Sequence, residues 1–265
     1  MLIIGERINS TRAHIQEAMK ARNSGFIIKE ARKQVEAGAG FIDINCAMSL
    51  GDETQDIDWV ISTIQSEIRD VNICIDSPNY LAIQRALETY RAKGKLFINS
   101  ITGDRSRIDL IVPLAVKYNT GLIALTMGEC GMPNSAEERF AIAKDILAKV
   151  SKKGFKAEGL YFDPLIRPIS TEPEQAKEFL RSIPMIKSLG ARTVCGLSNI
   201  SYGLPDRKII NAAFLAMAIQ SGLDAAILDP TEKQVISSIA AAEALVCKDE
   251  YCAEYIKAFR EGRLV

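Results

Sequence analysis

Short apolar runs rich in β-branched residues alternate along this chain with longer segments whose apolar residues recur at helical spacing. The runs end on Gly, Pro, Asn or Asp, which is typical of buried strands bounded by turns. We predict strands at Leu2–Glu6, Gly40–Asn45, Val71–Asp76, Leu96–Asn99, Gly121–Thr126, Leu160–Asp163, Thr193–Gly196 and Asp224–Asp229. We predict helices between them, for example at Ile57–Ile68, Tyr80–Tyr90, Ile108–Val116, Glu137–Val150 and Ile209–Gln220, and a last helix near Asp249–Glu261.

This alternation predicts parallel strands covered by crossover helices, an α/β fold. Eight such units in about 250 residues match a closed (β/α)8 TIM barrel better than an open doubly wound sheet. The chain contains no internal repeat, low-complexity tract or linker that would favour a second domain. We therefore expect a single barrel domain over residues 1–265.

The charge balance changes which partners are expected. Thirty-three Lys and Arg residues offset thirty-three Asp and Glu residues, and 48% of the chain is hydrophobic. A net charge of zero provides no global attraction to nucleic acid or to an anionic membrane. No stretch approaches the roughly 18 apolar residues of a membrane span, and Glu6 and Arg7 fall too early for a signal peptide. We expect a cytoplasmic protein with neither of these partners.

Polar side chains gather where the predicted strands end. The positions are Glu6 and Asn9, Asp43 and Asn45, Asp76, Asn99, Asp163, Ser198 and Asn199, and Asp229. In a barrel these ends meet at one mouth, where barrel enzymes place their sites. A buried acid or amide without a partner costs about 1–3 kcal/mol, so this set requires either mutual contacts or a ligand.

For any single position, capping of the next helix is an equally good interpretation, as in Asp76-Ser77-Pro78-Asn79 or Ser198-Asn199. Capping does not explain why the whole set falls at the same end of successive strands. Oxygens and amides with almost no fixed cations suit a neutral heterocycle bearing N–H groups, whereas the phosphate-binding motifs are missing. Arg207 is the best candidate to hold an acidic tail of a ligand, and its alternative is a surface arginine that opens a helix.

Histidine and cysteine limit the available chemistry. The single histidine, His14, lies in an amphipathic stretch and is expected at the surface, so histidine-rich metal sites lack their usual ligands. The six cysteines show no close C-x-x-C pairing and suit reduced, buried thiols. They are Cys46, Cys74, Cys130, Cys195, Cys247 and Cys252. A thiolate site formed by Cys46, Cys74 and Cys195 remains the weaker alternative, and we expect no metal.

Ordered motifs at the strand ends resemble the pterin-binding (β/α)8 family, most closely the methyltetrahydrofolate:corrinoid protein methyltransferases. The resemblance covers essentially the whole chain, and its motifs are specific only in combination. They are Gly5-Glu6-Arg7-Ile8-Asn9, Asp43-Ile44-Asn45, Ile75-Asp76-Ser77, Ile98-Asn99-Ser100, Leu125-Thr126-Met127, Tyr161-Phe162-Asp163-Pro164-Leu165, Gly196-Leu197-Ser198-Asn199 and Phe214-Leu215-Ala216-Met217-Ala218.

The resemblance implies a role for each matching residue. Asp76, Asn99 and Asp163 would bind the pterin ring, and Asn199 would lie close to N5, which carries the methyl group. Gly196 and Ser198 would line the same pocket, Asp43 and Asn45 would support it, and Arg207 would lie toward the aminobenzoyl-glutamate. The strand-end pattern adds Glu6 and Asn9 as substrate-binding candidates. Proton supply to N5 would involve Asn199, Asp76 and Asp163. Tetrahydrofolate or its 5-methyl form would be the substrate, and a homodimer is expected.

Two departures separate this chain from related families. Dihydropteroate synthases carry an Arg-Val-His motif at strand eight, where this chain has Ala226-Ile227-Leu228-Asp229-Pro230. Cobalamin-binding modules of the Asp-x-His-x-x-Gly type need a histidine that is missing here, so cobalamin would come from a separate corrinoid protein. A dihydropteroate-synthase-like enzyme and a non-catalytic folate-binding protein remain alternatives. Met48, Met127 and Met132 near the mouth suit core packing or, less well, contacts with that partner.

Overall fold

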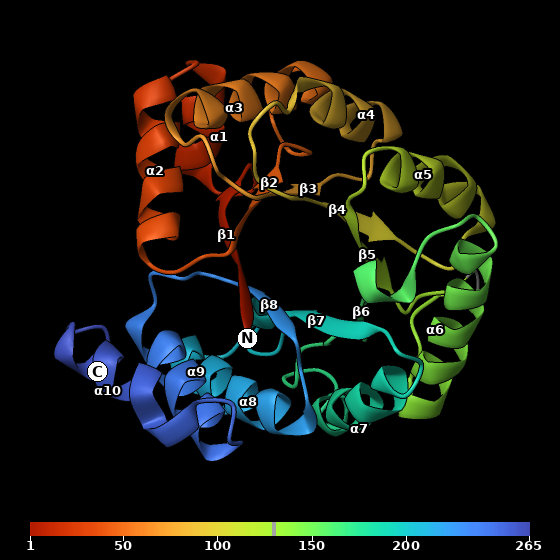
Figure 1. The fold of residues 1–265 in the computed structure, drawn as a ribbon, viewed down its shortest axis with the longest axis vertical. Helices are drawn as coiled ribbons and strands as arrows, with labels where there is room; N and C mark the ends of the chain where they lie inside the picture. The colour runs from red at the N-terminus through yellow and green to blue at the C-terminus, as the bar shows by residue number, and fades with distance from the viewer. Residues whose placement is uncertain (129–130) are drawn as a thin grey trace.

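The computed structural model describes residues 1–128 and 131–265, so Cys130 lies outside the described residues. Eight parallel strands of the described chain close into a barrel in sequence order, β1 to β8, and helices surround it (Figure 1). The strands are β1 (Leu2–Asn9), β2 (Phe41–Asn45), β3 (Ile73–Asp76), β4 (Leu96–Ile101), β5 (Gly121–Leu125), β6 (Leu160–Asp163), β7 (Arg192–Gly196) and β8 (Ala225–Leu228). The predicted single-domain (β/α)8 barrel is confirmed.

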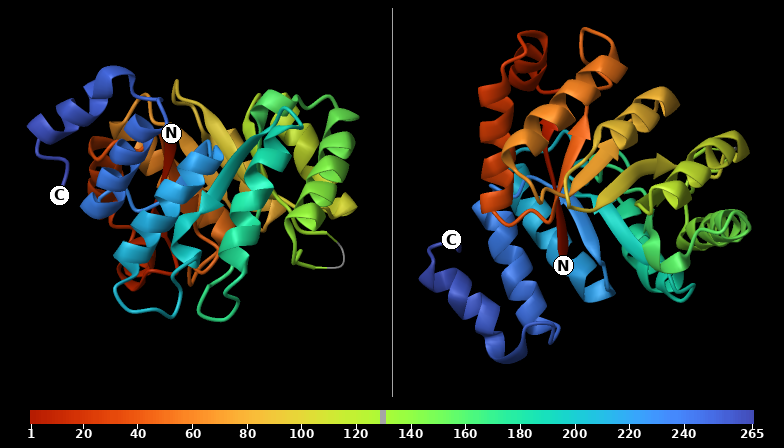
Figure 2. Two further views of the ribbon diagram at one scale, coloured as in Figure 1. Left: turned by 90° about the horizontal axis from the view of Figure 1, so that it is seen from below. Right: turned by 45° about the horizontal axis from the view of Figure 1, so that its top comes forward.

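The helical layer contains longer helices and short 3-10 turns. The helices are α1 (Ala13–Lys20), α2 (Ser24–Glu36), α3 (Glu53–Glu67), α4 (Tyr80–Thr89), α5 (Arg105–Lys117), α6 (Ala136–Ser151), α7 (Gln175–Lys187), α8 (Arg207–Ser221), α9 (Lys233–Leu245) and α10 (Ala253–Arg260). The 3-10 turns are η1 (Ala157–Gly159), η2 (Leu197–Asn199) and η3 (Glu250–Cys252). Figure 2 shows α10 outside the ring of helices, beyond α9. No helix in the described ranges combines the length and apolarity needed to cross a membrane.

Several predicted boundaries differ from the observed ones by a few residues, and two of the differences have identifiable reasons. Strand β1 continues past Glu6 to Asn9, because its pairing with β2 shifts register between Gly5 and Ile8 and then resumes. The last helix begins at Ala253, since Tyr251 and Cys252 have positive φ values of 55° and 56°, which a continuous helix does not allow. The first of these differences extends strand β1 to the mouth of the barrel.

Helix caps come from loop residues rather than from the strand-end residues. Asn79 caps α4 by accepting a hydrogen bond of 3.0 Å from the Leu81 backbone N–H, and Asp52 and Asp104 cap α3 and α5. Asp76 is therefore free of the capping role. The capping interpretation of Ser198-Asn199 is wrong, because these residues lie in η2 while α8 begins at Arg207.

The barrel interior is filled by its own apolar layer, which includes Phe41, Phe97 and Tyr161 near the amino-terminal ends of the strands. Further clusters fill the space between strands and helices. Cys46, Cys74 and Cys195 are buried free thiols, as predicted, whereas Cys247 and Cys252 are exposed. His14 is exposed, as predicted.

Gly121 in β5 is required by the Phe97 ring. A Cβ atom added at Gly121 would lie 2.0 Å from Phe97 Cε1, inside any van der Waals contact. We expect Gly121→Ala to lower the free energy of unfolding by about 1–3 kcal/mol, because either the ring or the strand must shift. Denaturant unfolding measures this change. Gly25→Ala, whose added Cβ has only a 3.8 Å neighbour, is the matched control and should change stability by less than about 1 kcal/mol.

Candidate active site

Three neighbouring strands bring a row of polar side chains to one level of the mouth. Asn45 of β2 pairs in register with Asp76 of β3, and Asp76 pairs with Asn99 of β4. The Asn45 Nδ2 group donates a hydrogen bond of 2.8 Å to Asp76 Oδ2. Parallel register therefore builds an amide–carboxyl–amide row from residues that are 31 and 23 positions apart in the chain.

A second carboxyl group lies deeper on β2. Asp43 is only 2% exposed, and Asn99 Nδ2 donates to its Oδ1 across 3.4 Å. Burial first, and the negative charge of Asp76 second, raise the pKa of Asp43 well above its usual value. Burial also raises the pKa of Asp76, against the hydrogen bond from Asn45. The two carboxyl groups interact, so burial and the charge of Asp76 together favour the protonated form of Asp43.

Asp163 ends β6 on another part of the rim. Its Oδ1 accepts a hydrogen bond of 2.8 Å from the Leu165 backbone N–H. Burial raises the pKa of Asp163 to about 6, although backbone N–H groups of Leu165 and Gly196 favour the ionised form. The carboxylate is therefore ionised at neutral pH, yet it takes a proton at mildly acidic pH.

Glu6 of β1 faces the loop after β7. Ser198 Oγ donates a hydrogen bond of 2.9 Å to Glu6 Oε1, and Arg12 lies 3.5 Å from the same oxygen. Burial raises the pKa of Glu6, whereas the hydrogen bond from Ser198 and the charge of Arg12 oppose that rise. Contact between Glu6 and Ser198 joins the first and seventh strands across β8.

Two predicted residues have local roles. Asn9 accepts hydrogen bonds from the Thr11 backbone and hydroxyl at 2.9 and 2.7 Å, which forms a turn. Asp229 binds Arg7 at 2.8 Å and the Thr231 hydroxyl at 2.7 Å. Both side chains therefore bind neighbouring protein groups, and the substrate-binding role of Asn9 stays a prediction.

Asn199 is exposed at the mouth, at the end of η2. Its side-chain amide has no hydrogen-bond partner among residues 1–128 and 131–265, in contrast to Asn45 and Asn99. The adjacent Gly196 leaves room for it, since a Cβ atom at position 196 would lie 3.3 Å from Asn199 Nδ2. The amide is thus available to a ligand as donor or acceptor.

Arginines that the sequence interpretation underestimated surround the mouth. Arg12 is near Glu6, and Arg107 donates to the Ser77 and Ser100 carbonyls at 2.7 and 3.0 Å. The expectation of almost no fixed cations is therefore wrong. Arg207 is exposed, and it binds the Ser201 hydroxyl at 3.0 Å and the Ser198 carbonyl, so it holds the loop that carries Asn199. Its predicted contact with an acidic tail stays a prediction.

Arg139 supports Asp163 from behind, and sequence analysis missed it. This fully buried side chain donates to the Pro164 carbonyl at 2.6 Å and to Gln175 Oε1 at 2.7 Å. These bonds hold the turn after Asp163, in which Leu165 has a φ of 62°. A signal was present, because Arg139 occupies the same helical face as the buried residues Ala143, Ile146 and Val150.

The side chains of the described residues offer little to a metal ion. Within the described ranges, no group of three or more His, Cys, Asp or Glu residues is arranged to hold a metal ion. Burial raises the pKa of the thiols of Cys46, Cys74 and Cys195, which keeps them protonated and weakens them as ligands.

The mouth also has exposed apolar side chains on its loops. Met48 and Met132 are 60% and 51% exposed, so core packing is the wrong interpretation for both. Met127 is half-buried, while Leu50 and Tyr202 are exposed on neighbouring loops. We name Met48, Leu50, Met132 and Tyr202 the apolar rim.

Comparison with known proteins agrees with this arrangement. A family model described as "Pterin binding enzyme" matches residues 5–229, from the first strand-end motif to the last. The chain belongs to the pterin-binding enzyme family. Within this family, the chain is 30% identical over 268 residues to a methylcorrinoid:tetrahydrofolate methyltransferase of Eubacterium limosum, covering 100% of this chain and 98% of that protein. The resemblance stated from the sequence is confirmed.

More distant relatives of this pterin-binding enzyme share parts of the pattern. It is 29% identical over 244 residues to methionine synthase of Mycobacterium tuberculosis, which covers 86% of this chain but 20% of that protein. The crystal structure of Yersinia pestis dihydropteroate synthase superposes with a TM-score of 0.70 at 16% identity, over 93% of each chain. At that identity the likeness establishes the fold alone.

The close approach of Gly196 to Asn199 gives a testable result. We expect Gly196→Ala to lower the turnover of methyl transfer about tenfold, since the added methyl group displaces the Asn199 amide. Steady-state kinetics beside Gly25→Ala as control measures this effect. Unchanged turnover in Gly196→Ala would show that the position of Asn199 is not critical.

Proposed function

We propose that this chain transfers a methyl group between N5 of 5-methyltetrahydrofolate and the cobalt of a corrinoid carried by a separate protein. The observation that carries the proposal is the exposed amide of Asn199, unpaired among the described residues, at the same mouth as the hydrogen-bonded carboxyl and amide groups of β2, β3 and β4. Full-length similarity to a methylcorrinoid:tetrahydrofolate methyltransferase supports the same reaction.

Pterin binding would use the groups at the ends of β3, β4 and β6. The carboxyl groups of Asp76 and Asp163 would accept hydrogen bonds from the amino and ring N–H groups of the pterin. Asn99, which donates to Asp43, would add a carboxamide to the site. Asn45 holds Asp76 in orientation through its 2.8 Å hydrogen bond. Charge-assisted bonds of this kind are about twice as strong as neutral ones, which favours tight and oriented binding.

Methyl transfer requires a change of hydrogen bonding at N5. In the direction toward cobalt, the Co(I) electron pair forms the new Co–C bond, and the electron pair of the broken N5–C bond stays on N5, which takes up a proton. A tertiary amine is a poor leaving group, so a contact that strengthens as N5 is protonated lowers the barrier. Asn199 can make this contact because a carboxamide both donates and accepts. The proton would arrive from solvent through a network that includes Asp76 and Asp163.

The mouth must admit a corrin ring presented by another protein. The exposed apolar rim of Met48, Leu50, Met132 and Tyr202 provides an adaptable surface around the site. Direction and pathway depend on that partner, for example acetyl-CoA synthesis or glycine betaine or methylamine demethylation. We further propose that the chain forms a homodimer and that it is cytoplasmic. The reduced thiols of Cys46, Cys74 and Cys195 are in keeping with the cytoplasmic location.

Parallel product assays test this function against its alternatives. The purified chain is given 5-methyltetrahydrofolate with reduced cobalamin in one assay, and a pterin pyrophosphate with 4-aminobenzoate in another. Methyl transfer in the first and no condensation in the second is the expected result. Condensation would establish the dihydropteroate-synthase-like alternative, and folate binding without either reaction would establish a non-catalytic folate-binding protein.

A further inference from the structure

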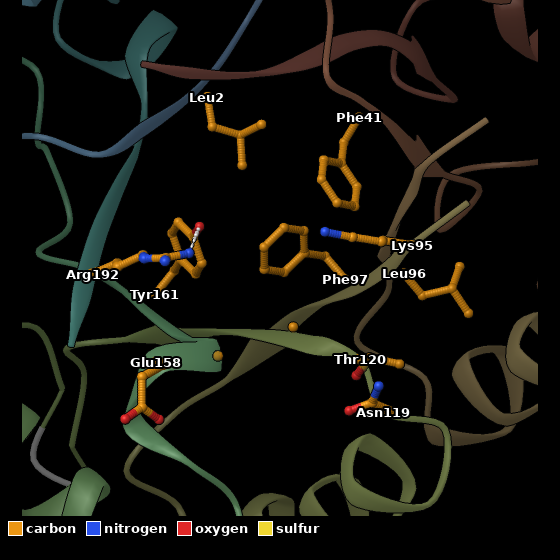
Figure 3. A pocket seen from close by; sticks show the side chains of 12 residues that line it. Leu2, Phe41, Lys95, Leu96, Phe97, Asn119, Thr120, Glu158, Tyr161 and Arg192 are labelled. Atoms are coloured by element: carbon orange, nitrogen blue, oxygen red, sulfur yellow. Dashed lines mark hydrogen bonds between the residues drawn. The ribbon is translucent and has the colours of Figure 1, made fainter. Parts of the chain in front are cut away.

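A cavity of about 530 Å³ opens at the end of the barrel opposite the candidate active site (Figure 3). Its lining includes Leu2, Leu96 and Arg192, the first residues of β1, β4 and β7. The other ends of β1 and β7 carry Glu6, Asn9 and Gly196 of the mouth. The cavity is therefore a separate site, and its volume lies within the roughly 300–1,000 Å³ typical of small-molecule pockets.

Aromatic rings form the inner surface of this cavity. The Phe41 and Phe97 ring centroids are 4.6 Å apart, and those of Phe97 and Tyr161 are 4.9 Å apart with nearly perpendicular planes. Each of the three side chains is 6% exposed, so the rings are held in place by the barrel core where they line the cavity. Gly121 allows Phe97 to lie across β5. The result is a rigid apolar surface that needs no rearrangement to accept a flat ligand.

Two cations extend over this surface. Figure 3 shows the Lys95 and Arg192 side chains pointing from opposite sides toward the middle of the cavity. The Arg192 guanidinium lies 5.4 Å from the Tyr161 ring centroid and donates a 2.7 Å hydrogen bond to its hydroxyl. Within the described part of the chain, neither cation has a carboxylate within 4.0 Å, and Glu158 is the carboxylate of the lining. With Lys95 and Arg192 against Glu158, the lining has a net positive charge.

We propose that this cavity binds a planar aromatic carboxylate. The carboxylate lies between Lys95 and Arg192, and the ring packs against Phe97 and Tyr161. An arginine held by a tyrosine hydroxyl presents its remaining N–H groups in a fixed fork, which matches a carboxylate. An inorganic anion would use the two cations and leave the aromatic surface exposed, whereas a neutral ring would leave the cations unpaired.

Calorimetric titration of the full chain with 2-naphthoate tests this inference. We expect one site per chain with a dissociation constant of about 1 mM or tighter. Neutral 2-naphthamide and inorganic phosphate should each bind at least about tenfold more weakly, because each uses only half of the site. Equal affinity for naphthoate and naphthamide, or for naphthoate and phosphate, would overturn the proposal.

Substitutions locate the site. Arg192→Gln and Lys95→Gln should each weaken naphthoate binding about tenfold, and Lys93→Gln, an exposed lysine outside the lining, should leave it unchanged. Both lining residues are exposed, so the folded state is expected to tolerate either change, and a melting curve checks this. Saturating 5-methyltetrahydrofolate should not compete. Competition, or wild-type affinity in both lining variants, would place the naphthoate elsewhere and refute the inference.

Discussion

Asn199→Ala is expected to lower kcat for methyl transfer by about 10²–10³-fold and to leave the dissociation constant of 5-methyltetrahydrofolate within about threefold of the wild-type value. The amide is exposed and unpaired within the described residues, so its removal breaks no internal contact. Its contact with N5 strengthens only as the N5–C bond breaks, and a contact of this kind affects kcat more than binding. Anaerobic stopped-flow kinetics and equilibrium titration separate the two quantities.

Asn199→Gln is the conservative comparison, because it keeps the carboxamide but moves it by one methylene group. An intermediate loss of kcat is expected from that variant. Lys177→Ala, an exposed change on α7, should match the wild type in both measurements. Wild-type kcat in Asn199→Ala would remove Asn199 from the proposed mechanism.

Asp163→Asn is expected to weaken 5-methyltetrahydrofolate binding by about 100-fold or more and, at pH 8, to stabilise the folded chain. Weaker binding follows because an ionised acceptor of ring N–H groups becomes a neutral amide that also carries donors. The substitution weakens binding but increases the free energy of unfolding, because burial raises the pKa of Asp163 to about 6. The folded state then holds the proton more tightly than the unfolded state, and ionisation above pH 6 penalises folding.

The pH dependence makes this second prediction specific. Stability contributed by protonated Asp163 is complete below the unfolded pKa near 4 and is lost as pH rises through about 6. The pKa of Asp163 differs by about two units between the folded and unfolded states, which corresponds to a loss of at most about 3 kcal/mol in the free energy of unfolding. Asp163→Asn recovers this loss at pH 8 but not at pH 4. Denaturant unfolding at both pH values measures it. A stability difference between variant and wild type that is independent of pH would contradict the assigned burial effect.

Much of this architecture could be predicted from the sequence because a parallel strand buried on both faces is a continuous apolar run, and eight such runs have few arrangements. The row of Asn45, Asp76 and Asn99 follows directly from parallel register. The end of strand β1 was harder to predict, since a register shift beyond Gly5 has no periodic signature in the sequence.

The arginines of the mouth show why the remainder could not be predicted. Arg107 donates to the Ser77 carbonyl from helix α5, and Arg139 donates to the Pro164 carbonyl from helix α6. Contacts of this kind depend on side-chain direction across elements that are far apart in sequence. The cap at Asn79 was equally hidden, because Asp76 and Asn79 fit a capping pattern equally well.

Anaerobic spectroscopy of the purified chain with cob(I)alamin and 5-methyltetrahydrofolate tests the proposed function most directly. Loss of the Co(I) band with growth of methylcobalamin, and the reverse reaction from methylcobalamin and tetrahydrofolate, both slowed in Asn199→Ala, is the predicted result. Tight binding of the folate with no methyl transfer in either direction, even after candidate corrinoid proteins are added, would contradict it.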